Sequence, residues 1–176
     1  MLNVQLTDIQ TLRDRARHNV EQGAVTEGYG ADREEIIRLL NGSLATELVC
    51  TLRYKRHYFM ASGLKASVAA AEFLEHAQQE MAHADKLAER ITQLGGEPDF
   101  NPDNLSKNSH AQYVAGTTLK EMVTEDLVAE RIAIDSYREI IQYIGEKDPT
   151  TRRIFEDILA QEEEHADDMA ELLEGI

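Results

Sequence analysis

The sequence predicts an all-α protein, a four-helix bundle with a short helical extension at its N-terminus. Glycine and proline occur mainly between four long segments, each with apolar residues at the three-and-four spacing of a helix. Each segment also carries a glutamate near its middle, on the apolar side. A chain of 176 residues suits a single domain. We expect residues 1–30 to form the extension and residues 31–176 the bundle.

The extension and the first hairpin are predicted in turn along the chain. The extension is expected to hold one short helix, at about residues 7–22. The first bundle helix is predicted at about residues 32–61, because Asp32 and Glu35 have the spacing of a capping box. The second is predicted at about residues 65–94, where a pair of glycines ends it.

The second hairpin follows a long connection, residues 97–116. The third helix is predicted at about residues 118–144, because Thr118 and Glu121 repeat the capping-box spacing. The fourth, at about residues 148–173, begins with an aspartate and a proline, an N-cap and first-turn signature. Short connections within each pair predict two antiparallel hairpins, and the long connection can cross the bundle between them.

The inward stripes of the four helices carry an unusual set of polar residues. A buried carboxylate is costly without a partner, and these stripes contain no lysine or arginine. Two divalent cations would balance four glutamates, and two neutral imidazoles would complete their ligands. The pattern of one glutamate on each of two helices and Glu-x-x-His on the others is typical of two-metal bundles. The predicted ligands are Glu47, Glu80, His83, Glu130, Glu162 and His165.

An internal repeat relates the two hairpins. Residues 80–89 and 162–171 share Glu, His, Ala, Asp, Ala and Glu in register. Tyr54 and Tyr137 each follow the glutamate of their own helix by two turns. These matches predict a pseudo-twofold axis through the metal site.

Over about residues 33–173 the sequence resembles the bacterioferritin and Dps-like branch of the ferritin superfamily. The resemblance implies a ferritin-like fold and two iron ions per subunit, one held by Glu47 with His83 and the other by Glu130 with His165. Glu80 and Glu162 would bridge them. The implied activity is that of a ferroxidase, which oxidises Fe(II) with O2 or H2O2 to store or detoxify iron. Manganese or zinc can also occupy such carboxylate–imidazole sites.

The resemblance suggests roles for four further residues. Tyr54 matches a tyrosine that acts as a one-electron donor, although a core tyrosine with a satisfied hydroxyl is the alternative. Met81 matches the methionine that ligates haem b across a twofold dimer axis, although methionine is also an ordinary interface residue. Gln79 and Gln161 stand where the family implies aspartates that orient the histidines, so the charge behind these rings differs.

Three other residues on or near the stripes have simpler interpretations. We expect His76 to be a core histidine or to line an exit channel rather than to bind metal. Asp126 could guide iron, but a water-exposed acid at the end of the bundle is the commoner explanation. Cys50 is the only cysteine, so no thiol pair can form, and an inert buried thiol is the default.

Assembly and partners are expected from charge and resemblance. The family implies a homo-oligomeric cage of 12 or 24 subunits built from dimers, and the absence of a further C-terminal helix favours 12 or a smaller assembly. A formal charge of −15 repels DNA and attracts cations. Neither a membrane span nor a secretory leader is evident, which predicts a cytoplasmic protein. The alternative functions are a DNA-protecting Dps-like ferritin and a di-iron or di-manganese peroxidase-type enzyme.

Overall fold

The fold is helical throughout the part of the chain that the computed structural model describes, residues 6–62 and 66–176. None of the helices in these ranges combines the length and apolar composition that a membrane crossing requires. The helices are α1 (Ile9–Arg15), a 3-10 turn η1 (Val20–Gln22), α2 (Arg33–Met60), α3 (Ala66–Gln93), α4 (Pro102–Asn108), α5 (Leu119–Ile144) and α6 (Pro149–Gly175).

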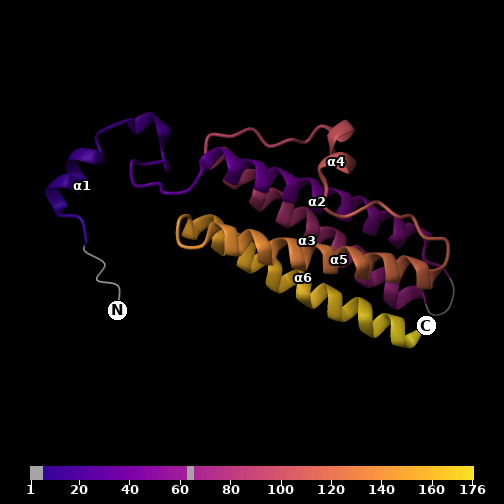
Figure 1. Ribbon diagram of the computed structural model, residues 1–176. Helices are drawn as coiled ribbons and strands as arrows, with labels where there is room; N and C mark the ends of the chain where they lie inside the picture. The colour runs from indigo at the N-terminus through magenta and orange to yellow at the C-terminus, as the bar shows by residue number, and fades with distance from the viewer. Residues whose placement is uncertain (1–5, 63–65) are drawn as a thin grey trace.

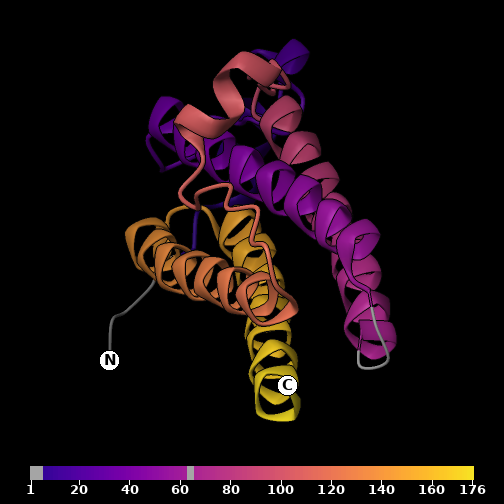
Figure 2. The ribbon, with the colours of Figure 1, turned by 90° about the vertical axis from the view of Figure 1, so that its right-hand side faces the viewer.

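The four long helices form two hairpins that pack against each other. Helix α2 packs on α3, and α5 packs on α6, with further contacts from α2 to α5 and from α3 to α6. Figures 1 and 2 show the hairpins side by side, with the connection from α3 to α5 passing over α2. The predicted bundle with two hairpins and a long crossover is therefore confirmed. The predicted start of the second helix at Lys65 lies outside the described residues.

The helix ends follow the local signals in the sequence. The side chain of Asp32 accepts a hydrogen bond from the Glu35 amide, although the Glu35 carboxylate bonds Arg38 instead of completing a capping box. Thr118 forms the full capping box at the start of α5. Gly145 ends that helix with φ = 52°, a conformation that favours glycine.

The crossover contains a short helix that the sequence analysis did not predict, α4. Asn101 caps it and Pro102 occupies its first turn. The crossover is bound to α2 by polar contacts, because Asn41 donates to the carbonyl of Glu97 and Thr46 accepts from the amide of His110. These contacts hold the crossover along the outer side of α2 (Figure 1).

The N-terminal extension is less regular than the single helix expected at residues 7–22. Helix α1 ends at Arg15, and Asn19 adopts a left-handed conformation with φ = 50° before η1. A left-handed residue does not fit within an α-helix, so the short helix expected at about residues 7–22 covers only part of that range. Helix α1 buries no residue and projects beyond the end of the bundle in Figure 1.

Two apolar clusters fill the bundle on either side of its middle. One contains Leu40, Leu44, Leu87, Ile140 and Phe155, and the other contains Phe73, Ala77, Val123 and Met169. Each of the four helices passes from one cluster to the other, and the polar stripe residues lie between them. The two apolar clusters therefore shield the polar residues in the middle of the bundle from solvent.

Candidate metal centre

The six side chains predicted to bind metal lie together at the middle of the bundle. All are buried, with no more than 1% of their surface exposed. Helices α2 and α5 each contribute one glutamate, whereas α3 and α6 each contribute a glutamate and a histidine three residues later, on the same helix face.

These side chains form two overlapping groups, within each of which the ligand atoms lie within 4.8 Å of one another. Glu80 and Glu162 belong to both groups. Glu47 and His83 complete the first, and Glu130 and His165 complete the second. The arrangement can therefore hold two cations with two shared carboxylates.

The Nδ1 atoms of both histidines face the glutamates. His83 Nδ1 lies 2.9 Å from Glu162 Oε1 and 3.3 Å from Glu47 Oε2. His165 Nδ1 lies 3.5 Å from both Glu80 Oε1 and Glu162 Oε2. Each imidazole thus contacts carboxylates from both hairpins.

The opposite nitrogen of each ring is held by a glutamine on the other hairpin. Gln161 Oε1 lies 2.7 Å from His83 Nε2, and Gln79 Oε1 lies 2.7 Å from His165 Nε2. An amide oxygen can only accept, so Nε2 donates and the Nδ1 lone pair of the neutral ring points to the carboxylates. The glutamines therefore orient the histidines even though they lack the charge of the expected aspartates.

Two tyrosines bind the outer glutamates in the same crossed manner. Tyr54 of α2 donates to Glu130 of α5, and Tyr137 of α5 donates to Glu47 of α2. Burial and the neighbouring glutamates raise the pKa of both hydroxyls. Both tyrosines are therefore neutral donors at ordinary pH.

Several polar atoms of the cluster have no hydrogen-bond partner among the described residues. They are Glu80 Oε1, Glu130 Oε2, Glu162 Oε1 and His165 Nδ1. Buried polar atoms without a partner are costly, and carboxylate oxygens with imidazole nitrogens are ligands for divalent transition metals. These residues therefore fit a pair of such ions.

Protons partly satisfy the cluster when it holds no metal. Burial and Glu80 raise the pKa of Glu47 to about 8, and burial with Glu80 and Glu162 raises that of Glu130 well above its usual range. Burial lowers the pKa of His165, but the nearby carboxylates of Glu162 and Glu80 more than offset this and raise it to about 9. Metal binding must displace these protons.

Asp126 is not the water-exposed acid that was expected, because it is fully buried. Its carboxylate lies 2.7 Å from Arg53 Nε and 2.7 Å from His57 Nδ1. Arg53 and His57 also bond the carbonyls of Gln112 and Ala115, which binds the crossover to the bundle. These contacts give the group a structural role. Arg53 forms its ion pair with Asp126 and not with the glutamates of the cluster.

His76, Cys50 and Met81 surround the cluster. The ring of His76 stacks on that of His165, with centroids 4.0 Å apart, and burial and His165 lower its pKa to about 4. Cys50 is buried, and burial raises the pKa of its thiol well above the usual value, as the inert assignment requires. Met81 is 40% exposed on α3, on the outside of the bundle.

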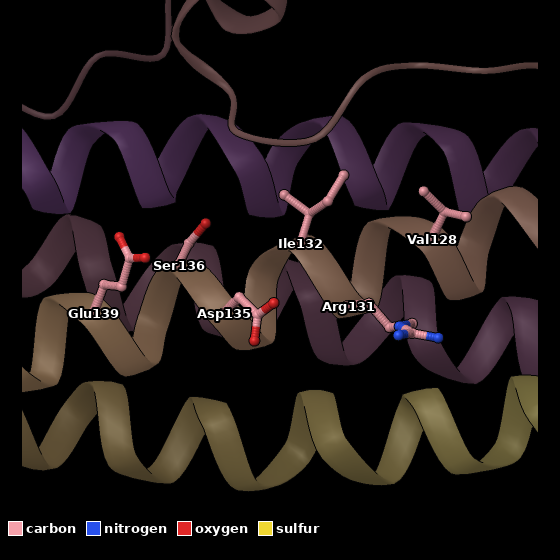
Figure 3. Close-up of a pocket in the computed structure, with 6 residues that line it drawn as sticks. All are labelled: Val128, Arg131, Ile132, Asp135, Ser136 and Glu139. Carbon is pink, nitrogen blue, oxygen red and sulfur yellow. The ribbon is translucent and has the colours of Figure 1, made fainter.

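A surface depression of about 460 Å³ lies on the outward face of α5, away from this cluster. Figure 3 shows the six side chains that line it, all from α5, and none is a predicted ligand. Both acidic and basic groups line it, which suits a solvated helix face: Val128, Arg131, Ile132, Asp135, Ser136 and Glu139.

The fold and this cluster define a class of proteins: four-helix bundles with a buried carboxylate–histidine cluster. A model of the ferritin-like domain family matches residues 37–176. Bacterioferritin from Mycobacterium avium is 32% identical over 145 residues, which cover 80% of this chain and 84% of that protein. The chain therefore belongs to the ferritin-like family, in its bacterioferritin branch.

Solved structures show the same relationship. The dodecameric thioferritin, a bacterioferritin-related protein from Bacteroides fragilis, superposes with a TM-score of 0.80 and 31% identity, over 83% of this chain and 88% of that one. BfrA from Mycobacterium tuberculosis gives a TM-score of 0.70 and 30% identity, over 80% and 83%. Dps from Thermosynechococcus elongatus, at 22% identity and a TM-score of 0.76 over 80% and 90%, shares the fold.

Proposed function

We propose that the protein is a ferroxidase that stores or detoxifies iron, with Fe(II) as the substrate of the buried cluster. The overlap of the two ligand groups at Glu80 and Glu162 supports this most directly. Two adjacent ferrous ions supply two electrons, which reduce O2 to H2O2, or H2O2 to water, with protons from solution. Family membership agrees with this assignment.

In this proposal Glu47 and His83 hold one ion and Glu130 and His165 hold the other, with Glu80 and Glu162 shared. The outer glutamates keep their orientation through Tyr137 and Tyr54, which donate to them. The histidines keep theirs through the crossed glutamines. The protein thus presents a fixed set of ligands that need not reorganise when iron arrives.

Aerobic oxidation of Fe(II) by the purified protein tests the proposal. We expect Glu80→Ala and His165→Ala to reduce the rate of ferric absorbance to that of iron without protein. Glu139→Gln, on the exposed face of α5, is the control and should match the wild type. Oxidation at the wild-type rate in both cluster variants would refute the proposal. Turnover of H2O2 with the metal-loaded protein, without added Fe(II), would instead indicate a peroxidase.

We also propose a homo-oligomeric cage. The bacterioferritin-related relative of known structure is dodecameric, and the bundle of residues 31–176 would form its wall with residues 1–30 as an extension. Exposed apolar side chains on α2, including Leu52 and Phe59, provide surface for contacts between copies. Light scattering of the purified protein would give the mass, and a monomer would contradict the cage.

A further inference from the structure

A second group of metal-ligating side chains lies beside the centre, at the surface where α3 and α6 meet. It consists of Glu72 and His76 of α3 and Asp168 of α6, with one ligand atom from each within 4.8 Å of the others. The imidazole is 1% exposed, whereas both carboxylates are partly exposed. The group therefore has one buried nitrogen and two oxygens that reach solvent.

Each ring nitrogen of His76 has a polar neighbour within hydrogen-bond distance. The Tyr54 hydroxyl donates to Glu130, so toward His76 Nδ1, 3.3 Å away, it can only accept. His76 Nε2 lies 3.3 Å from Asp168 Oδ2, within hydrogen-bond distance, and 3.8 Å from Glu72 Oε2. A cation held by this nitrogen and the two carboxylates would take the place of a proton on Nε2.

The same arrangement occurs at both histidines of the centre. There Nε2 contacts the neutral amide oxygen of a crossed glutamine, and Nδ1 faces carboxylates. At His76 the neutral oxygen is that of Tyr54 and the roles of the two nitrogens are exchanged, so Nε2 faces the carboxylates. A divalent cation satisfies such a set of ligands.

A cavity of about 410 Å³ connects this group to solvent. Glu72 and Asp168 line it together with Glu171, Val68 and Leu172, and its charged side chains are acidic. His76 does not line the cavity, but its ring stacks on that of His165. The acidic lining attracts a cation from solvent to Glu72 and Asp168, which lie beside a histidine that contacts the centre.

We propose that Glu72, His76 and Asp168 form a third divalent-cation site, which receives Fe(II) from solvent before it moves to the buried centre. The inference deepens the proposed function and rests on it. The site holds a ferrous ion through one nitrogen and two carboxylates, without changing its oxidation state. Transfer requires the ion to pass the edge of the His76 ring toward Glu130 and His165.

Zinc stoichiometry of the metal-free protein, measured by equilibrium dialysis, tests the site. We expect three ions per chain in the wild type, and two in Asp168→Asn and Glu72→Gln, which keep side-chain size but weaken the ligands. Glu171→Gln lines the same cavity outside the group and should still bind three. The expected kinetic effect is a several-fold higher KM for Fe(II) in Asp168→Asn with kcat unchanged.

The outcomes separate this site from the proposed function. Two ions in the wild type and Asp168→Asn alike would overturn the third site and leave the ferroxidase centre intact. No zinc in the wild type would overturn both. A crystal soaked in Mn(II) should show anomalous density between His76 and Asp168. A His76 ring protonated on both nitrogens in the zinc-saturated protein, by ¹⁵N NMR, would show that a proton takes the place of the cation.

Discussion

The Nε2 atom of His83 lies 2.7 Å from the amide oxygen of Gln161, which belongs to the opposite hairpin. His165 and Gln79 form the reciprocal pair at the same distance. Each hairpin thus carries one of the two predicted histidine ligands and the glutamine that orients the histidine of the other hairpin. The histidine rings keep their positions only while the hairpins are packed together.

The glutamines should matter for metal affinity. We expect Gln161→Ala to weaken zinc binding roughly 10–100-fold, because the His83 ring loses the acceptor that fixes its orientation and proton. Gln161→Glu should retain tight binding, because a carboxylate accepts the same bond. Competition with a chelator measures the affinity, and Gln142→Ala, an exposed glutamine on α5, is the control. If Gln161→Ala and Gln79→Ala bind zinc with unchanged affinity, the glutamines do not orient the histidines for metal binding.

The metal-free protein should become less stable as the pH rises. The pKa of Glu47 is raised from 4.5 to about 8 and that of His165 from 6.5 to about 9. The folded state therefore binds more protons than the unfolded state in this range, so the free energy of unfolding falls between about pH 6.5 and 9. Calorimetry should show a falling Tm.

With zinc bound, the Tm should instead rise with pH. The cations displace the same protons and bind more tightly as the pH rises. Glu47→Gln removes one of the two titrating groups and should flatten the metal-free profile. A Tm that rises with pH in the metal-free wild type would contradict the prediction.

Asp126→Asn should destabilise the fold without emptying the metal centre. The substitution leaves the buried guanidinium of Arg53 without its anion, and breaking a buried pair from one side costs about 3–5 kcal/mol. Urea unfolding measures the loss. Glu139→Gln should change the stability by less than about 0.5 kcal/mol. Both variants should bind as much zinc as the wild type, and loss of zinc in Asp126→Asn would place Asp126 in the centre.

Tyr54 and Tyr137 provide a matched pair for testing electron donation. Each hydroxyl donates to a buried glutamate of the opposite hairpin, so Tyr54→Phe and Tyr137→Phe should cost similar stability, about 1–3 kcal/mol. If Tyr54 is the one-electron donor, freeze-quenched samples of the wild type and Tyr137→Phe should show a tyrosyl radical by electron paramagnetic resonance. The signal should be lost in Tyr54→Phe. A tyrosyl radical that persists in Tyr54→Phe would show that another tyrosine donates the electron.

The predicted haem ligand can be tested by reconstitution. Met81 is 40% exposed on α3, so its thioether is accessible from outside the bundle. Haem b added to the wild type should give a Soret band with methionine ligation, and Met81→Leu should abolish it. Met60→Leu changes another exposed methionine and serves as the control. Failure of the wild type to take up haem would leave Met81 as a surface residue.

The helices and the clustering of the six side chains follow from local sequence patterns. A glutamate in register with an apolar stripe must face the core, and Glu80 and His83 share a helix face because they are three residues apart. The sequence also predicted correctly that Asp32 and Thr118 cap the first turns of α2 and α5. These features depend on neighbours along one helix, so spacing alone identifies them.

Contacts between helices were not predictable in the same way. Asp126 is buried because Arg53 of another helix neutralises it, and no spacing within α5 indicates that partner. Gln161 stands where the resemblance implies an aspartate, and its spacing along α6 did not indicate that its amide reaches the histidine of the other hairpin. In the extension, α1 ends at Arg15 and Asn19 adopts a left-handed backbone before η1, which a helical period does not reveal.

The crossed tyrosine and glutamine contacts couple folding to metal loading. Glu47 on one hairpin depends on Tyr137 of the other, and Glu130 depends on Tyr54 in return. In each tyrosine–glutamate pair the two residues belong to different hairpins. A single hairpin therefore lacks the residues that orient its own glutamate. A cation held at the predicted ligands would contact both hairpins, so the hairpins could not separate without releasing it. The supply of metal would then affect how often the two hairpins separate.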